Sequence, residues 1–182
     1  MKINRRKFIR YLSALGSTLF LPGSFFSGET KAAVLPPLKY KPEPDKWRND
    51  TVTLCWVGHS TVLINFYGKW ILTDPVLSRK IGVRLLGSVF GPTRQTPPAL
   101  SIDEIPKPDL ILLSHAHMDH MDYPTLEAFT EKYPGEIDVV TAYLTADVID
   151  DLNWKSVTVL DWNEKTSSGG IEIRALEVKH FG

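Results

Sequence analysis

A short histidine-rich stretch directly after an apolar run constrains this chain more than any other feature. Residues 110–113 read Leu-Ile-Leu-Leu, which predicts a buried strand, and residues 114–122 continue as Ser-His-Ala-His-Met-Asp-His-Met-Asp. Three of the five histidines of the protein lie here, at His115, His117 and His120. Imidazole and carboxylate groups are ligands that zinc and similar divalent metals prefer. We therefore expect a metal site rather than a histidine-rich surface turn or a pH-sensitive cluster.

The spacing of these side chains predicts two sets of metal ligands. His115 and His117 are two residues apart, so they leave the end of a strand on the same side. Asp119 and His120 belong to the turn that follows and point elsewhere. One short loop therefore offers ligands to two neighbouring metal ions.

Composition narrows the class of protein without identifying it. The 182 residues are 43% hydrophobic, which suits one domain with one core. Lysine and arginine (21) balance aspartate and glutamate (21), so no strong field indicates nucleic acid or an acidic partner. The single cysteine, Cys55, cannot form an internal disulfide, and its apolar neighbours predict a small buried side chain.

Residues 1–33 have the order of segments that is typical of an export signal. A cationic cluster at 4–10 is followed by an uncharged stretch at 11–28 and by small residues at 30–33. Arg5 and Arg6, followed by Lys-Phe-Ile, resemble a twin-arginine signal, so we expect an exported, periplasmic protein. An uncleaved membrane anchor and a basic tail are the alternatives. Four prolines within residues 34–50 predict an extended lead-in.

The rest of the chain, residues 51–182, combines strands and helices. Short β-rich runs predict strands at residues 51–57, 61–66, 70–73, 110–113, 137–140, 156–160 and 171–178, the first three as a meander. Helices are expected at 125–133, after Pro124, and at 142–152. Residues 76–108 form a long irregular connection, expected to be functional or to carry a small helix. Strands first and alternation later predict a layered α/β domain with a mixed sheet.

The histidine stretch and several other segments resemble a known family. His115-Ala-His117-Met-Asp119-His120 is similar to the His-x-His-x-Asp-His motif of metallo-β-lactamase-fold hydrolases. Further segments resemble the branch of that family that contains N-acylphosphatidylethanolamine phospholipase D and ascorbate-phosphate lactonase, and they lie at residues 56–64, 71–76, 91–94, 160–162 and 180–181. The resemblance implies an αββα sandwich over residues 51–182. Lys179 departs from the family pattern.

The resemblance also implies a ligand set and a mechanism. His115, His117 and His180 would bind one metal, while Asp119 and His120 would bind the second. Two zinc ions are expected, although manganese and iron accept the same ligands. Two such ions lower the pKa of a shared water, and the resulting hydroxide attacks the substrate. Asp119 and His120 are the expected catalytic residues, with Asp119 orienting the water or taking its proton.

Four residues outside the histidine stretch have two interpretations each. Asp74 is either a second-shell carboxylate that fixes the tautomer of a ligand histidine or an Asp-Pro turn that ends a strand. Like His115 and His180, it lies at the carboxyl end of an expected strand, where ligands gather in such folds. His59 either holds a tight turn or lines the substrate pocket. Arg79 and Arg94 either meet an anionic substrate or are solvated.

The family pattern also requires a bridging aspartate and a further histidine after the third histidine. The last residue is Gly182, so the resemblance implies only the N-terminal half of the sandwich, with five of the seven metal ligands. The expected function is metal-dependent hydrolysis of phosphodiester, phospholipid-like substrates. Lactone hydrolysis and an inactive metal-binding fragment are the alternatives. Expected partners are a small-molecule or phospholipid substrate and, optionally, a membrane surface, with no nucleic acid; the oligomeric state is open.

Overall fold

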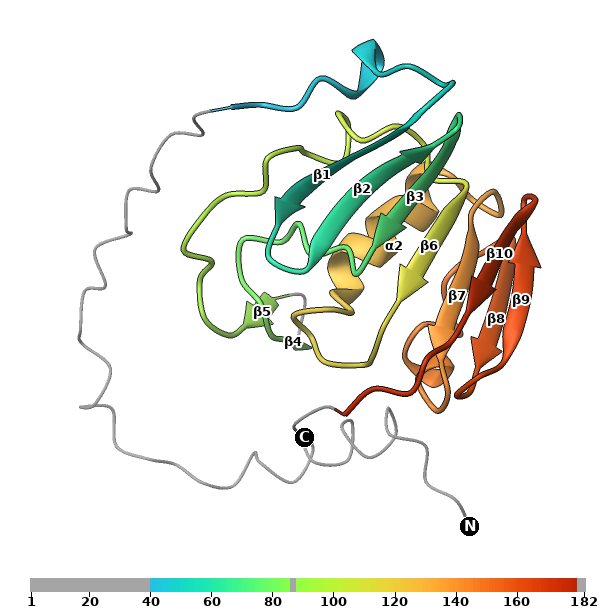
Figure 1. The fold of residues 1–182 in the computed structure, drawn as a ribbon. Coiled ribbons are helices and arrows are strands. Elements are labelled where there is room, and N and C mark those ends of the chain that lie inside the picture. Colours follow the sequence, from blue (N-terminus) through green and yellow to red (C-terminus); the bar gives the residue numbers. More distant parts are fainter. Residues whose placement is uncertain (1–39, 86–87, 180–182) are drawn as a thin grey trace, which may run out of the picture.

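A computed structural model describes residues 40–85 and 88–179, and within them six strands form one mixed sheet (Figure 1). In sheet order the strands are β1 (Val52–Gly58), β2 (Thr61–Phe66), β3 (Lys69–Thr73), β6 (Leu110–Leu113), β7 (Asp138–Ala142) and β8 (Ser156–Leu160). The expected α/β class with a mixed sheet is confirmed. The export signal expected over residues 1–33 and the ligand His180 lie outside the described residues.

Two tight turns build the antiparallel half of the sheet. In β1 and β2, Val52 lies opposite Phe66, and the pairing of β2 with β3 continues the meander. Gly58 (φ 131) and Gly68 (φ 85) stand at the two turns in backbone conformations that favour glycine. The predicted meander is therefore confirmed.

Parallel pairing builds the other half and brings two strand ends together. β3, β6, β7 and β8 are parallel neighbours in that order. Strands of this kind are covered on both faces, which explains the uninterrupted apolar sequence of β6. Because β3 and β6 run in the same direction, the residues that follow them, Asp74 and Ser114, emerge side by side at one edge.

A helix and a hairpin cover opposite faces of the sheet (Figure 1). The helix α2 (Tyr123–Lys132) has proline in its first turn, as expected, and buries Leu126 and Phe129 completely. Its face of the sheet contributes a core that includes Val57, Leu63, Leu72, Ile111 and Val139. On the other face, β9 (Lys165–Ser168) and β10 (Ile171–Arg174) pair with each other, and Ile173 packs against a second cluster formed by Ile71, Leu110, Val140 and Leu160.

Three segments differ from the expectations of the sequence. The helix predicted at 142–152 is wrong, because only a short 3-10 turn, η3 (Ala146–Val148), forms there. Thr145 Oγ1 donates to the Ala142 carbonyl at 2.6 Å, a side-chain bond that competes with helical pairing. The last predicted strand ends at Arg174. Residues 76–108 carry a hairpin, β4 (Val83–Leu85) and β5 (Ser88–Phe90), in place of a helix.

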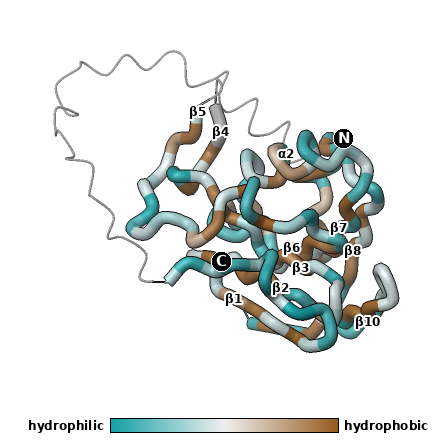
Figure 2. Tube along the Cα trace, turned by 90° about the horizontal axis from the view of Figure 1, so that it is seen from above, coloured by the Kyte–Doolittle hydropathy of each residue, from teal (hydrophilic) through white to brown (hydrophobic). Residues whose placement is uncertain are grey.

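Apolar residues are spread along the whole described trace (Figure 2), and some of their side chains are exposed. Leu54 and Trp56 on β1 are each 64% exposed. Cys55 between them is half-buried rather than buried as predicted, and its partial burial raises the pKa of the thiol. The lead-in contains one short helical turn, η2 (Pro44–Lys46). Within the part of the chain that is described, no helix is both long and apolar enough to cross a membrane.

Candidate metal centre

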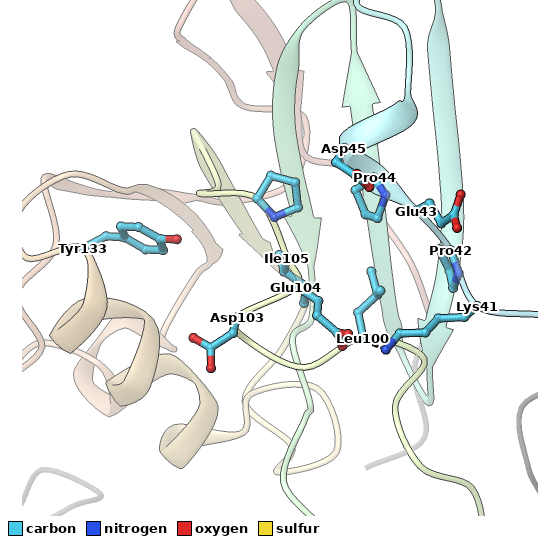
Figure 3. Close-up of a pocket in the computed structure, with 11 residues that line it drawn as sticks. Lys41, Pro42, Glu43, Pro44, Asp45, Leu100, Asp103, Glu104, Ile105 and Tyr133 are labelled. Atoms are coloured by element: carbon cyan, nitrogen blue, oxygen red, sulfur yellow. Dashed lines mark hydrogen bonds and ion pairs between the residues drawn. The ribbon is translucent and has the colours of Figure 1, made fainter.

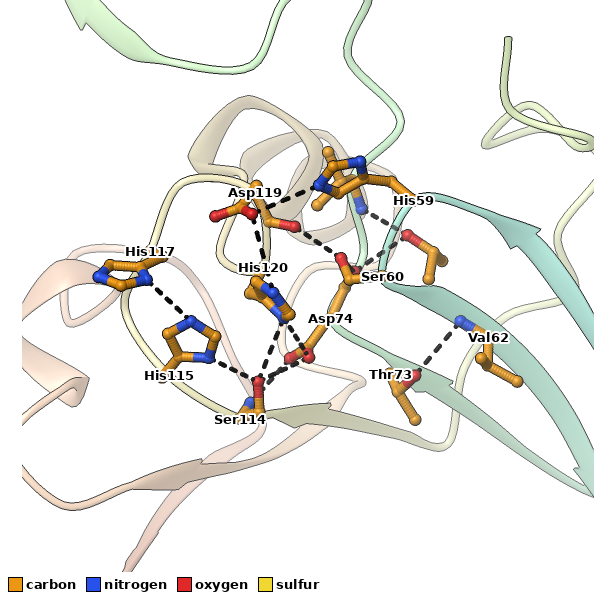
Figure 4. A network of polar contacts seen from close by, with 12 residues as sticks. His59, Ser60, Val62, Thr73, Asp74, Ser114, His115, His117, Asp119 and His120 are labelled. Carbon is orange, nitrogen blue, oxygen red and sulfur yellow. Dashed lines mark hydrogen bonds and ion pairs between the residues drawn. The ribbon is translucent and has the colours of Figure 1, made fainter. Parts of the chain in front are cut away.

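Three loops meet at the carboxyl ends of β3 and β6 (Figure 4). The metal loop, residues 114–122, runs from the end of β6 to the start of α2, while Asp74 follows β3 directly. The third loop is the β1–β2 turn, which carries His59 and Ser60. The structure thus brings together the described side chains that the sequence singled out: His59, Asp74, His115, His117, Asp119 and His120.

The first pair of donors is formed by His115 and His117. His115 Nε2 lies 3.0 Å from His117 Nδ1, and the ring centroids are 4.6 Å apart. Two nitrogens that bind one tetrahedral zinc ion at about 2.0–2.1 Å lie roughly 3.3 Å from each other. The separation of these two nitrogens is therefore close to that of neighbouring ligands on one ion.

The second pair is formed by His120 and Asp119. His120 Nδ1 is 2.8 Å from Asp74 Oδ2, and an ionised carboxylate only accepts hydrogen bonds. The proton of the imidazole is therefore assigned to Nδ1, which leaves the lone pair of Nε2 available to a metal. This Nε2 lies 3.8 Å from Asp119 Oδ2.

A serine extends the control of Asp74 to the first donor pair. Ser114 Oγ donates its one proton to Asp74 Oδ2 at 2.6 Å, and it lies 2.9 Å from His115 Nδ1. Because its proton is already used, Ser114 Oγ accepts from His115 Nδ1–H, and the lone pair of His115 then faces His117. One carboxylate thus sets the tautomers of a histidine in each pair, directly for His120 and through Ser114 for His115.

Asp74 is itself held in an unusual conformation. Its φ of 38° lies in the left-handed region, which is unfavourable for residues other than glycine. Ser114 N donates to Asp74 Oδ1 at 2.7 Å, and Thr61 Oγ1 donates to the Asp74 carbonyl at 3.0 Å. Asp74 therefore ends β3 and also contacts His120, so both interpretations of this residue describe the structure; its effect on metal binding stays a prediction.

The β1–β2 turn is tied to the metal loop by Ser60, which the sequence did not single out. Ser60 Oγ donates to the carbonyl of Asp119 at 2.6 Å and lies 3.2 Å from that of Asp74. His59 has a φ of 55°, and its carbonyl accepts a hydrogen bond from Trp56 Nε1 at 2.7 Å. Its ring faces the loop, with Nε2 3.5 Å from Asp119 Oδ2. A serine two residues after the turn glycine Gly58 was the only signal for this link.

The environment of Asp119 favours its charged form. Partial burial acts to raise the pKa of this carboxyl. Hydrogen bonds from its own backbone N–H and from His59, together with the nearby His120, outweigh that effect and lower the pKa below its ordinary value. Asp119 is therefore anionic at neutral pH, as a metal ligand or proton acceptor must be.

The described donors do not complete a coordination shell. Across residues 40–85 and 88–179, no three histidine, cysteine or carboxylate side chains gather closely enough to hold one ion by themselves. The site therefore consists of two donor pairs, and the expected third histidine, His180, lies outside the described residues. The residue types, the spacing within the first pair and the assigned tautomers fit a zinc-class ion; the ligand roles stay predictions.

Arg94 belongs to the support of the site, and both interpretations of it from the sequence are wrong. Its side chain is neither solvated nor open to a substrate, because the residue is 6% exposed. Its guanidinium donates to the carbonyls of Val76 and Thr96, and a Cβ on Gly58 would lie 2.8 Å from Nη2. Burial lowers the pKa of Arg94, and this effect outweighs the negative charge of Asp122, which acts to raise it; Asp122 is 1% exposed. Arg94 and Asp122, the last residue of the metal loop, are thus buried charges that attract each other, while Arg94 Nη2 and Asp122 Oδ1 each lack a hydrogen-bond partner among the described residues.

Two cavities of similar size differ in their relation to the donors. One, of about 590 Å³, lies between the β4–β5 hairpin and the metal loop, and its lining includes His59, His117 and Asp119. The other, of about 580 Å³, lies between the lead-in and residues 100–106 (Figure 3). Lys41, Glu104 and Tyr133 line it, but none of the donors does. Of these two cavities only the first borders the donors, and a third cavity, of about 640 Å³, is lined by Asp74 and Ser114.

Comparison with known proteins identifies a family and several relatives of the chain. The profile of the family described as Beta-lactamase superfamily domain matches residues 69–182. An uncharacterized protein of Mycobacterium tuberculosis is 30% identical over 143 residues, which cover 76% of this chain and 37% of that protein. The N-acyl-phosphatidylethanolamine-hydrolyzing phospholipase D 1 of Caenorhabditis elegans is 29% identical over 139 residues, which cover 70% of this chain and 37% of the enzyme.

Among solved structures, a possible metal-dependent hydrolase from Veillonella parvula is similar to this chain with a TM-score of 0.48 and 19% sequence identity. The similarity covers 68% of this chain and 45% of that one. The chain thus spans little more than a third of the length of these two curated relatives, 37% in each case.

Proposed function

Because the chain belongs to the beta-lactamase superfamily, we propose that it carries the metal loop of a metal-dependent hydrolase. The observation that carries the proposal is the pairing of donors around Asp74. His115 and His117 face each other at 3.0 Å, and His120 Nδ1 contacts Asp74 at 2.8 Å. A hydrogen-bonded surface turn does not require one carboxylate to fix a histidine in each pair.

The proposed cofactor is a pair of zinc ions. His115 and His117, with His180, would hold one ion, and Asp119 with His120 would hold the other. When bound, such ions supply Lewis acidity and lower the pKa of water. The protein contributes fixed tautomers through Asp74 and Ser114. Asp119, kept anionic by its lowered pKa, orients a water molecule or accepts its proton.

The proposed substrates are phosphodiesters of the phospholipid kind. Two observations support this choice over lactones. The relative from Caenorhabditis elegans is named for hydrolysis of N-acyl-phosphatidylethanolamine. In addition, the cavity beside His117 and Asp119 has apolar lining from Ile81, Phe90 and Met118, which suits a substrate with an apolar part.

Hydrolysis of a bis-aryl phosphate by the zinc-loaded full chain tests the proposal. We expect turnover that chelation abolishes and that Asp119→Asn lowers by about 10²–10⁴-fold, because the variant loses the proton acceptor. Asp103→Asn, whose parent side chain is 90% exposed, is the control and should match the wild type. Turnover of lactones alone would favour the lactonase, and weak binding of one metal without turnover would favour the inactive fragment.

Export is the second part of the proposal. Its support is the sequence of residues 1–33, with Arg5 and Arg6 before an uncharged stretch. Fractionation of cells that express the full chain should place it in the periplasm, and Arg5→Lys/Arg6→Lys should retain it in the cytoplasm. Equal periplasmic amounts of the two proteins would contradict a twin-arginine route.

A further inference from the structure

The β4–β5 hairpin exposes a pair of large apolar side chains close to the metal loop. Val83 on β4 lies directly opposite Phe90 on β5, and the two residues are 38% and 61% exposed. Met118 of the metal loop, 40% exposed, lines the same cavity as this pair. Figure 2 shows that β4 and β5 stand away from the main sheet. Neighbouring exposed apolar side chains of this kind mark an interaction surface.

The base of the hairpin is built to be narrow. A Cβ on Gly82 would lie 2.0 Å from the Phe90 carbonyl oxygen, and one on Gly91 would lie 1.9 Å from that of Ile81. Only glycine permits this close approach of the two backbones. The amide of Ile81 also donates to the Pro92 carbonyl at 3.0 Å. The hairpin is therefore a slender ribbon that holds Val83 and Phe90 beyond a closed base.

The charged residues of the hairpin segment itself are all basic, whereas the carboxylate of Asp119 on the metal loop lines the neighbouring cavity. Residues 75–102 contain no aspartate or glutamate but include arginines at 79 and 84 and a lysine at 80, while a third arginine, Arg94, is buried. Arg79 and Lys80 are exposed at the base, where Lys80 pairs with Thr93. Apolar side chains beyond exposed cations are the arrangement of a segment that enters the headgroup region of an anionic bilayer. A protein partner with an apolar groove would not require the cations.

We propose that the β4–β5 hairpin docks the protein on an anionic lipid surface. Val83 and Phe90 enter the boundary between headgroups and acyl chains, while Arg79 and Lys80 meet the anionic headgroups. The cavity next to His117 and Asp119 then opens toward the lipid. Docking is independent of hydrolysis; only the delivery of a lipid to the metal loop rests on the proposed function.

Sedimentation with vesicles tests the docking. We expect the full chain to bind phosphatidylcholine–phosphatidylglycerol vesicles more tightly than phosphatidylcholine vesicles, with binding that weakens as salt is added. Val83→Ser/Phe90→Ser and Arg79→Gln/Lys80→Gln should each weaken binding roughly tenfold or more. Leu54→Ser, which removes an apolar side chain that is 64% exposed on β1, is the matched control. Equal binding by all variants would overturn the proposal.

A local probe separates the hairpin from other segments that bind lipid. A fluorophore on Ser88→Cys in a Cys55→Ser background should shift to the blue with the phosphatidylglycerol vesicles, whereas the same label on Ser167→Cys of β9 should not. No shift at position 88 would overturn the proposal. The variant His115→Ala should keep full vesicle binding but lose hydrolysis, because docking does not need the metal. A zinc-loaded wild-type chain that docks without hydrolysing would refute the proposed function and leave the docking intact.

Discussion

At the scale of single residues, Asp74 is the point on which both donor pairs depend. Its carboxylate receives only donors: the Ser114 amide and hydroxyl at 2.7 and 2.6 Å and His120 Nδ1 at 2.8 Å. Asp74 also has a left-handed φ, which is unfavourable for any residue that carries a Cβ. Such strain persists where the surrounding contacts determine the conformation, and it is concentrated at functional sites.

Asp74→Asn is expected to weaken zinc binding about 10–100-fold, the effect typical of losing a partner that orients a metal ligand. The amide keeps the size of the side chain but turns an NH₂ group toward groups that are all donors. Competition with a chromophoric chelator measures the affinity. Asp103→Asn serves as the control, and equal affinities for the two variants would contradict the role of Asp74.

Ser114→Ala is expected to weaken zinc binding, while Ser114→Thr keeps it, because only the hydroxyl transmits the influence of Asp74 to His115. NMR of the histidine rings in the zinc-free chain reports the tautomer of each ring. A general loss of packing would not change the tautomer of His115 alone. In Ser114→Ala, the Nδ1–H tautomer of His115 should lose its dominance. An unchanged tautomer would show that the serine has no such effect.

Arg94 is a buried cation that acts on Asp122, the buried last residue of the metal loop. Arg94→Met is expected to destabilise the fold by about 3 kcal/mol, because it leaves the Val76 and Thr96 carbonyls without their donor and removes the positive charge that attracts the buried Asp122 carboxylate. Urea unfolding measures the loss, and Arg48→Met, whose parent side chain is 77% exposed, is the control. In the double variant Arg94→Met/Asp122→Asn the loss should be smaller than the sum of the single losses. Additive losses would mean that the two charges do not interact.

At the scale of elements, local sequence patterns predicted the strands and the helix whose formation depends on residues close together in the chain. Short β-rich runs predicted the meander, β7 and β8. The apolar run at 110–113 predicted β6, and Pro124 predicted the start of α2. The helix expected at 142–152 does not form, since the backbone of Leu144 has a left-handed φ of 61° and the Thr145 hydroxyl bonds to the Ala142 carbonyl. The β4–β5 hairpin was not predicted. Its narrow base depends on the close approach of Gly82 to Phe90 across the hairpin, and a periodic pattern of apolar residues does not reveal such a contact.

The lead-in is fastened to the domain by a surface ion pair that is sensitive to acid. Glu104 pairs with Lys41 and accepts hydrogen bonds from the Ser101 amide and hydroxyl, and these contacts lower its pKa from 4.5 to about 2. A folded-state pKa below the unfolded value means stabilisation that is complete above pH 4.5 and is lost as the pH falls toward 2.

Glu104→Gln should therefore have a lower Tm than the wild type at neutral pH, and the difference should shrink as the pH falls through this window. Thermal unfolding over a series of pH values measures it. The effect should be small, because the pair is exposed and screened by salt. A difference in Tm that is independent of pH would contradict this assignment.

At the scale of the whole molecule, the site is assembled from segments that are distant in the chain. Ser60 bonds to Asp119 across 59 residues, and Asp74 contacts His120 across 46. The sequence identified most of the chemical groups because their types and spacing are local. It could not reveal Ser60, Ser114 or the Arg94–Asp122 pair, because hydroxyls and a buried cation carry no pattern until the parallel strands bring their loops together.

The central claim is that residues 114–122 bind metal in two donor pairs, and the zinc content of the purified full chain tests it most directly. We predict two equivalents for the wild type, one for His115→Ala/His117→Ala and one for Asp119→Asn/His120→Ala. The fourfold variant should bind none, while Asp103→Asn should bind as the wild type does. Unchanged zinc content in the fourfold variant, or no binding by the wild type, would contradict the account.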